Sequence, residues 1–380
     1  MSVLHVLGGL LEVLALAGIG HGLLSARFIA TLGRTAEPDP SGPAVTLLKP
    51  LCGAEAGLLA NLESFLRQDY PGSVQVVFGV QDPADPALRA VQALRDAHPE
   101  ADIEVVVDAA QHGANRKVSN LINMAARARH EVLVLSDADI AVVPDYLARV
   151  VAALEQPGVG AVSCYYRGEG RAGLWSLLAA MGVSYGFLPN VALGVGLGMA
   201  HPCMGSTIAL SRSTLDQIGG FARFRDELID DYELGRAVRA LGLEVALPPA
   251  SVVHGCSEVS LPELFGHELR WAATVRMVDP AGHAGSVVGH PVALALFAAL
   301  LLEGRPWALL VLIAAIATRF WLKARVDRAV GANSGPAVLL PARDLLSFAV
   351  YIASLFARRV YWRGAGFRVS SARKSLQPGS

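Results

Sequence analysis

Cysteine, charge and aromatic side chains are all scarce in this sequence. Its four cysteines include no CxxC pair, which argues against a zinc site and gives no sign of a disulfide framework. Only 17% of the residues are charged, and 32 Lys and Arg nearly cancel 33 Asp and Glu, so no overall basic field exists to hold a nucleic acid. Hydrophobic residues make up 53% of the chain. This composition predicts a globular domain attached to a bilayer.

An apolar run near the N-terminus predicts a membrane anchor. Residues 6–26 supply about the 20 apolar positions that a spanning helix needs. No basic segment or A-x-A site marks the run for cleavage, so we expect residues 1–35 to remain as a transmembrane anchor. Arg27 and Arg34 follow the run and place the next domain in the cytoplasm by the positive-inside tendency.

The C-terminal third is apolar again. Residues 287–302 and 307–322 predict a helical hairpin, and the apolar run 345–356, preceded by Arg343 and Asp344, is too short to span and predicts a re-entrant or interfacial helix. We therefore assign residues 285–360 to a transmembrane hairpin with an interfacial helix, and 361–380 to a basic cytoplasmic tail.

A further stretch, residues 172–211, contains no Asp, Glu, Lys or Arg. Pro189 and several glycines interrupt it, which argues against one continuous span. The expectation is helices and loops that lie against the membrane or form a lipid-facing cleft.

Between these apolar ends, short apolar runs alternate with helical patterns from residue 44 to residue 135. Such alternation predicts βαβ units and an α/β fold with a mainly parallel sheet. The runs 74–80 and 132–135 are typical of strands that are buried on both faces. Ligands bind beyond the carboxyl ends of such strands, so attention falls on the residues after Val80 and Leu135.

Pairs of carboxylates follow both of these strands. Asp137 and Asp139 could bind a hard divalent cation that holds a diphosphate, although many such triplets are only solvated turns. Asp82 and Asp85 could accept hydrogen bonds from a base or a ribose, or could simply begin a helix at residue 87.

Three further motifs carry candidate chemistry. Asp231 begins a helical pattern and could act as a general base or merely complement the helix dipole. Arg270 and Trp271 offer a charged fork for phosphate and a stacking face, or an interfacial anchor, while His267 before them could be structural. Lys117, at a helix start, could reach phosphate or lie at the surface.

In order along the chain, these motifs form a series. It runs through Lys49-Pro50-Leu51, residues 81–86, Lys117 with Asn120, Asp137-Ala138-Asp139, Asp231 and His267-Glu268-Leu269-Arg270-Trp271. The series resembles the ceramide glucosyltransferase-like family of membrane glycosyltransferases (family 21 type), and within it the bacterial hopanoid-biosynthesis glycosyltransferases. The resemblance covers roughly residues 47–280. Each motif alone is weak, but the ordered set is specific.

The resemblance implies a fold and a set of site residues. The expected fold is GT-A, a Rossmann-like mixed sheet of the nucleotide-diphospho-sugar transferases, over residues 44–280. The family pattern D, D, D, (Q/R)xxRW maps to Asp85, Asp137, Asp231 and the Arg270-Trp271 pair, with Asp82 as a competitor for the first position. His267 stands where the family has Gln or Arg. Pro50 and Glu55 are expected to line the uridine pocket.

The implied chemistry is inverting transfer of one sugar from a UDP-sugar. A divalent cation, Mg²⁺ or Mn²⁺, on Asp137 and Asp139 would neutralise the departing UDP, and Asp231 would take a proton from the acceptor hydroxyl. The sugar is expected to be a hexose or N-acetylhexosamine, with N-acetylglucosamine favoured. The expected acceptor is a membrane lipid, hopanoid tetrol first and ceramide second.

The expected location is the bacterial inner membrane, with several spans and the catalytic domain in the cytoplasm. Two alternatives stay open. A processive polysaccharide synthase would share a related acid series but needs a channel built from several spans. A non-catalytic scaffold or a transporter would need no divalent-dependent UDP binding.

Overall fold

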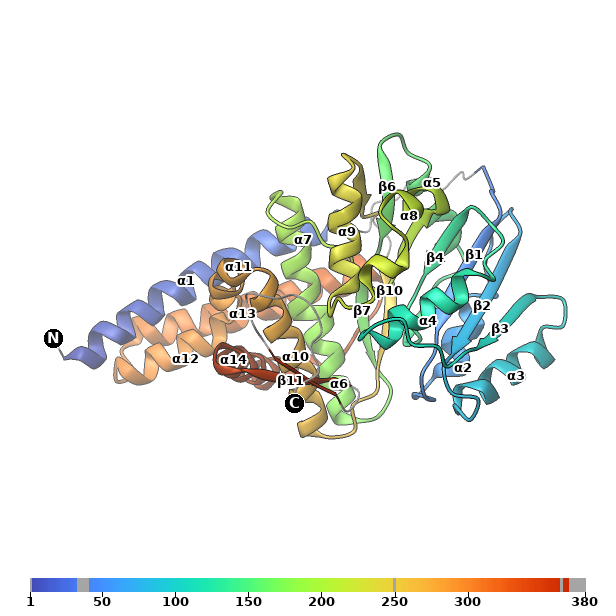
Figure 1. Cartoon of the computed structure of the whole chain (residues 1–380). Coiled ribbons are helices and arrows are strands. Elements are labelled where there is room, and N and C mark those ends of the chain that lie inside the picture. Colours follow the sequence, from blue (N-terminus) through green and yellow to red (C-terminus); the bar gives the residue numbers. More distant parts are fainter. Residues whose placement is uncertain (1, 33–40, 249–250, 363–364, 369–380) are drawn as a thin grey trace.

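A seven-stranded sheet at one end and a bundle of long helices at the other make up the chain (Figure 1). This computed structural model describes residues 2–32, 41–248, 251–362 and 365–368. The predicted tail at 361–380 lies partly outside the described residues.

The large sheet is mixed, with a parallel half. Its strand order is β3-β2-β1-β4-β8-β6-β9, and β8 runs antiparallel to both of its neighbours. The strands are β1 (Val45–Pro50), β2 (Val74–Val80), β3 (Asp102–Val107), β4 (Val132–Leu135), β6 (Val159–Ser163), β8 (Ile208–Ser211) and β9 (Glu244–Ala246). Strands β1 to β4 pair in parallel. The predicted α/β class and the two predicted buried strands are confirmed.

Helices cover both faces of this sheet because side chains alternate along each strand. Leu47 of β1 packs into the core formed with α2 (Leu58–Ser64), α3 (Ala87–Ala97) and α5 (Tyr146–Leu154). Its neighbour Leu48 packs on the opposite face. The helices of that face are α4 (Arg116–Ala125), α8 (Arg212–Gln217), η2 (Phe221–Phe224) and α9 (Asp230–Ala240).

A small second sheet lies beside the first. Its order is β5-β10-β7, from β5 (Ile140–Ala141), β10 (Ser251–Cys256) and β7 (Tyr165–Gly170). β5 is only four residues beyond β4, so this sheet holds the segment that follows the end of β4. The consequence is that Asp139 is fixed between the two sheets, where its backbone carbonyl accepts a 2.8 Å hydrogen bond from Gly255 N–H.

Residues 174–196 of the uncharged stretch form one continuous helix, which was not expected from the sequence. It consists of α6 (Leu174–Gly182), the π-helical turn η1 (Val183–Phe187) and α7 (Leu188–Gly196). Pro189 lacks an N–H and would clash in a regular helix, but the π turn before it widens the backbone, and Leu188 N–H bonds to Val183 O. At 23 residues this helix is long and apolar enough to cross a membrane. However, 56% of its apolar 18-residue segment is buried inside the protein.

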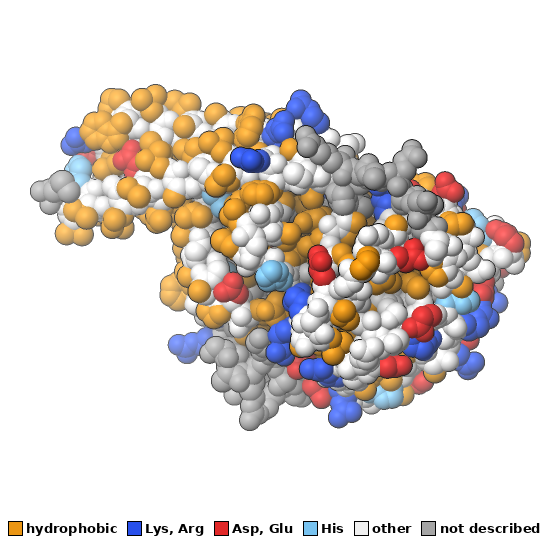
Figure 2. Space-filling view, turned by 90° about the horizontal axis from the view of Figure 1, so that it is seen from above, with side chains coloured by type: hydrophobic (Ala, Val, Ile, Leu, Met, Phe, Trp, Pro, Cys, Tyr) orange, Lys and Arg blue, Asp and Glu red, His pale blue; other side chains and the backbone are white. Residues whose placement is uncertain are grey.

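Helices from both ends of the chain form the bundle. They are α1 (Val3–Ile29), α10 (Leu261–Val278), α11 (Pro280–Gly285), η3 (Ser286–Gly289), α12 (Pro291–Leu301), α13 (Pro306–Val330), η4 (Ala337–Leu339) and α14 (Leu340–Phe356). Figure 2 shows an arm whose surface is mostly hydrophobic, while charged side chains gather on the α/β end. Among the described residues, four helices could cross a membrane by length and composition, or five if a pair bent by 66° counts as one span.

Two predictions for the bundle need correction. The helix expected from residue 287 begins at Pro291, after a break, and is only 11 residues long. The last apolar run is not too short to span, because its helix begins earlier and Ala337–Phe356 passes the same test of length and composition. Arg343 and Asp344 can lie inside this helix because both charges are paired with other helices. A hairpin of β11 (Arg359–Trp362) and β12 (Ala365–Arg368) follows.

Candidate active site

One large cavity lies where the parallel strands β1, β2 and β4 end. Its volume is about 760 Å³, within the range of pockets that hold a small ligand. Most of the predicted site residues line it: Pro50, Glu55, Lys117, Asp137, Asp139, Asp231, His267, Arg270 and Trp271. They come from segments up to more than 200 residues apart in the chain, and the fold brings these segments together around one cavity.

Lysine side chains stabilise the loop that carries Asp137 and Asp139. Lys49 is fully buried at the end of β1 and donates to the carbonyl of Asp137 at 2.6 Å and to Ser136 Oγ at 3.2 Å. Its ammonium lies 3.8 Å from the centre of the Phe65 ring. Burial lowers the pKa of Lys49 to about 7, against the opposing effect of nearby carboxylates. Lys49 therefore holds the loop through hydrogen bonds from the protein interior and is not among the described residues that line the cavity.

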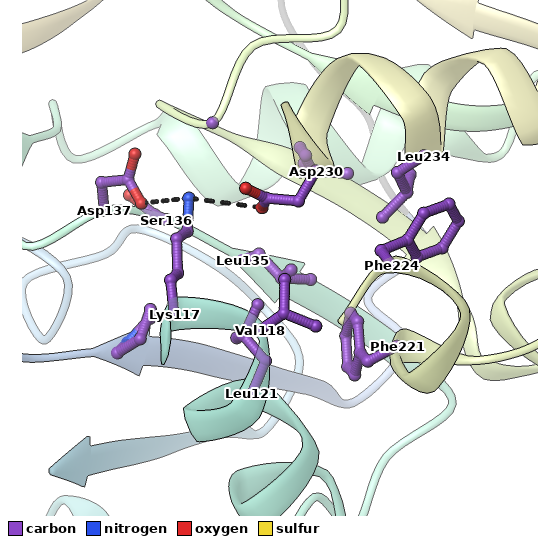
Figure 3. A pocket seen from close by; sticks show the side chains of 13 residues that line it. Lys117, Val118, Leu121, Leu135, Ser136, Asp137, Phe221, Phe224, Asp230 and Leu234 are labelled. Atoms are coloured by element: carbon purple, nitrogen blue, oxygen red, sulfur yellow. Dashed lines mark ion pairs between the residues drawn. The ribbon is translucent and has the colours of Figure 1, made fainter. Parts of the chain in front are cut away.

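Lys117 lies between two carboxylates (Figure 3). Its Nζ is 2.6 Å from Asp137 Oδ1 and 3.8 Å from Asp230 Oδ2. Burial alone would lower the pKa of Lys117, but the neighbouring carboxylates, Asp137 first, outweigh burial and raise it above the usual value. The small pocket of Figure 3 is lined by these charged side chains and by apolar ones, and at about 10 Å³ it has room for little more than a water molecule. The positive charge of Lys117 is thus presented toward the large cavity.

The second carboxylate of the loop meets a histidine that the sequence analysis missed. Asp139 Oδ2 lies 3.3 Å from His254 Nε2 on β10. Burial raises the pKa of Asp139, but His254 outweighs that effect and lowers it to about 2, while Asp139 raises the pKa of His254. His254 stands in the apolar strand 251–256, and nothing local in that run signals its distant partner.

Asp231 lies in the first turn of α9, where helix N–H groups face its carboxylate. Oδ1 accepts from Tyr232 N–H at 2.7 Å and Oδ2 from Gly205 N–H at 3.0 Å. Burial, followed by the like charge of Asp230, raises the pKa of Asp231 to about 6. A carboxylate with that pKa is largely ionised at neutral pH and is still basic enough to accept a proton.

Helix α10 contributes the last wall of the cavity. Its Ser260 N-cap accepts from Glu263 N–H, which fixes where the helix begins. His267 Nδ1 is 2.6 Å from Glu258 Oε1, and its ring meets Trp271 edge-on at 4.5 Å between centroids. Trp271 also packs edge-on against His254, at 5.9 Å. His267 therefore packs against Trp271 and also lines the cavity.

Aromatic side chains continue this wall. Tyr166 of β7 stacks on Phe187 of η1 with ring centroids 4.8 Å apart, and lies 5.7 Å from His254. Val275 and Thr274, one turn beyond Trp271, also line the cavity. The cavity is therefore lined by acidic and cationic side chains together with aromatic and apolar ones.

Asp82 and Asp85 are not among the described residues that line the cavity. Asp82 accepts from Ala84 N–H in an exposed turn. Asp85 accepts from Gly53 N–H at 3.0 Å and from Ala87 N–H at 2.9 Å, so it connects the loop after β1 to the start of α3. Gln81, directly after β2, does line the cavity. The predicted contact of either aspartate with a nucleotide stays a prediction.

The carboxylates after β4 fit the chemistry of a divalent cation. Oδ1 of Asp139 is buried and has no hydrogen-bond partner within the described part of the chain, so it is available to a ligand. No three His, Cys, Asp or Glu side chains of the described residues converge into a ready metal site. Mg²⁺ and similar ions often take only one or two protein carboxylates and complete their shell with phosphate oxygens and water. Asp137 and Asp139 would supply those two.

Comparison with known proteins agrees with this architecture. The chain matches a mannosyltransferase from Pyrobaculum calidifontis, solved with GDP-Man and Mn²⁺, with a TM-score of 0.50 and 24% identity over 91% of this chain and 99% of that one. The fold is a mixed α/β fold of the GT-A glycosyltransferase type, as predicted. Residues 10–375 match Glycosyl transferase family 21, and the chain belongs to that family.

Named relatives point the same way. Ceramide glucosyltransferase 1 of Caenorhabditis elegans is 26% identical over 246 residues, which cover 64% of this chain and 52% of the relative. Ceramide glucosyltransferase 3 of the same organism is 25% identical over 237 residues, or 61% of this chain and 50% of the relative. The chain thus spans about half the length of these curated relatives.

Proposed function

We propose that the chain is an inverting glycosyltransferase that transfers one sugar from a UDP-sugar to a hydroxyl of a membrane lipid. The sugar would be a hexose or N-acetylhexosamine, N-acetylglucosamine first. The acceptor would be bacteriohopanetetrol, on the resemblance of the motif series, with ceramide as the alternative that the named relatives support. The observation that carries the proposal is the cavity itself, which Asp137, Asp231 and Arg270 line together with aromatic side chains.

The donor side of the cavity suits a nucleotide diphosphate. Lys117 and Arg270 bring two cationic groups to the cavity. Positive groups fixed where charge develops stabilise a departing diphosphate, and one well-placed donor contributes about 2.7–4 kcal/mol in other enzymes. A divalent cation held by Asp137 and Asp139 would supply further neutralisation of the leaving group when bound.

The acceptor side suits a hydroxyl that arrives on an apolar carrier. Asp231 would accept the hydroxyl proton as the oxygen attacks the anomeric carbon. Attack from the face opposite the leaving UDP breaks the glycosidic bond to the diphosphate, forms the new one and inverts the centre. The aromatic row of Phe187, Tyr166 and Trp271 would stack on a sugar ring or hold the apolar part of the acceptor.

The helical bundle supports an acceptor that lies in a membrane. In the part of the chain that the structure describes, four or five helices could cross a membrane by length and composition, and they adjoin the α/β end that bears the cavity (Figure 1). Arg27, in the last turn of α1, and Arg34, which lies outside the described residues, support a cytoplasmic position for that end by the positive-inside tendency. A bacterial inner membrane is the setting we propose, since hopanoid acceptors are bacterial lipids by the resemblance above.

A panel of donors and acceptors tests the proposal. The full chain, in nanodiscs, would be incubated with labelled UDP-glucose, UDP-galactose, UDP-N-acetylglucosamine and GDP-mannose, together with bacteriohopanetetrol or ceramide. The expected product is one lipid that is heavier by a single sugar, seen by mass spectrometry. An Asp231→Asn variant is the matched control and should bind UDP-sugar but make no product.

Each other outcome has a defined meaning. A product with several sugars would favour a processive synthase instead. Transfer from GDP-mannose alone would overturn the UDP-sugar assignment. The absence of a labelled lipid with every donor and both acceptors would contradict the proposed function.

A further inference from the structure

A buried arginine in the bundle contacts the helix that carries Arg270 and Trp271. Arg343 of α14 is 4% exposed, and its guanidinium forms an ion pair with Glu268 of α10. It also donates to Ser347 Oγ at 2.8 Å. Gly182 of α6 lies so close that a Cβ there would overlap the guanidinium. Three helices therefore meet at this one side chain.

Helix geometry explains how the contact of Glu268 can determine the direction in which Arg270 faces. Residues two apart on a helix are separated by about 200° around its axis, so Glu268 and Arg270 face nearly opposite directions. Arg270 lines the cavity, while Glu268 points to α14. Any rotation of α10 that released Glu268 from Arg343 would turn Arg270 and Trp271 away from the cavity by the same angle.

A second contact fixes the other end of the helix. Arg276 of α10 donates to the carbonyls of Leu355 and Ala357 at the end of α14. Arg270 and Trp271 lie between this contact and Glu268 along the same helix. The two contacts together set both the rotation and the tilt of α10 against α14.

The energetics of the pair also point to a role other than stability. Burying an arginine and a glutamate costs desolvation that their attraction barely offsets, and an apolar pair of similar size is often as stable. The guanidinium adds a further unfavourable desolvation term, because Arg343 Nε is buried without a hydrogen-bond partner among the residues that the structure describes. Buried ion pairs of this kind can specify which surfaces of two elements meet.

We propose that Arg343 is a positioning residue for the transfer reaction: through Glu268 it holds α10 so that Arg270 and Trp271 face the cavity. This inference rests on the proposed function for the roles of Arg270 and Trp271. It links the position of a candidate membrane helix, α14, to the geometry of the site. Neither Arg343 nor Glu268 lines the cavity, so neither is a catalytic residue.

The chain contains a matched control next to Arg343. Asp344 forms a bidentate pair with Arg319 of α13, at 2.8 and 2.9 Å, and is buried to a similar degree. This pair joins two helices of the bundle and does not include α10. Arg319→Met therefore removes a comparable buried pair without releasing the helix of the site.

Kinetics give the first test. Arg343→Met and Glu268→Gln should each lower kcat by about tenfold to a hundredfold, as small misplacements of catalytic groups do, with KM for the donor changed by less than about threefold. Arg343→Lys should restore part of kcat. Because Arg343 acts through Glu268, the double variant should lose no more than Arg343→Met alone. Additive losses, or an equal loss of kcat in Arg319→Met, would overturn the proposal.

Hydrogen exchange gives a test that does not depend on activity. In nanodiscs, peptides from residues 261–278 should take up deuterium faster in Arg343→Met and Glu268→Gln than in the wild type and in Arg319→Met. Unchanged exchange of α10 would contradict the positioning role. Faster exchange in a protein that transfers no sugar would instead support the positioning of α10 while contradicting the proposed function.

Discussion

Gly205 N–H donates a 3.0 Å hydrogen bond to Asp231 Oδ2, and Gly205 also lies against the Asp137 carboxylate. One backbone position thus joins the proposed base to the loop that would hold the diphosphate. Burial, together with the charges of Asp230, Lys117 and Asp137, sets the pKa of this base.

The rate of transfer should fall at acid pH as Asp231 becomes protonated. Burial and Asp230 raise its pKa to about 6, and a base works only when ionised, so log kcat/KM should drop by about one unit per pH unit below that value. The measurement is a profile of kcat/KM between pH 5 and pH 8. Asp230→Asn removes the like charge that raises the pKa of Asp231 and should move the acid limb to lower pH. A flat profile down to pH 5 would contradict a base whose pKa is about 6.

A methyl group at Gly205 should disturb the site without unfolding the protein. A Cβ there would lie 2.9 Å from Asp137 Oδ2 and 3.1 Å from Lys117 Nζ, closer than ordinary contacts. We expect Gly205→Ala to lower kcat/KM by roughly tenfold to a hundredfold, in line with small misplacements elsewhere, with Tm nearly unchanged. Gly266→Ala, on α10 with open space around its Cβ, is the control. Equal kinetics in the two variants would show that the cluster tolerates the methyl group.

Local patterns were sufficient to predict the parallel half of the sheet. The strand at 74–80 has the predicted bounds, and the helix after it begins at residue 87 as predicted, because the apolar period and the turn residues beside them are local signals. The helix through Pro189 was missed because its continuity depends on a π turn, which leaves no such signal.

Long-range pairing explains the other differences. Arg343 and Asp344 argued against a long final helix, yet both are neutralised by partners on α10 and α13 that the local sequence does not reveal. Asp85 matches the family pattern, but its carboxylate accepts backbone hydrogen bonds from Gly53 and Ala87. His254 was not selected because its contact with Asp139 depends on the pairing of β5 with β10.

Removing divalent cations should abolish transfer if Asp137 and Asp139 hold a metal. A chelator is expected to stop the reaction and added Mn²⁺ or Mg²⁺ to restore it, since such an ion contributes several kcal/mol, or roughly a hundredfold or more in rate. Asp137→Ala with Asp139→Ala should abolish the divalent-dependent part of UDP binding in calorimetry. Asp102→Asn, at the exposed start of β3, serves as the control. Full activity in the presence of chelator would contradict a metal-dependent mechanism.

The buried ammonium of Lys49 should matter for both stability and donor binding. Lys49→Met fills the same space but leaves the Asp137 carbonyl without its 2.6 Å donor, so we expect a loss of about 1–3 kcal/mol in the free energy of unfolding. UDP affinity should fall further, because this carbonyl belongs to the loop of Asp137 and Asp139. Thr46→Val removes a buried hydrogen bond at the other end of β1, from Thr46 Oγ1 to Gln75 Oε1. This variant should have a lower Tm and an unchanged affinity for UDP. Thermal unfolding and calorimetry with UDP separate the two effects, and equal UDP affinity in both variants would mean that Lys49 only stabilises the fold.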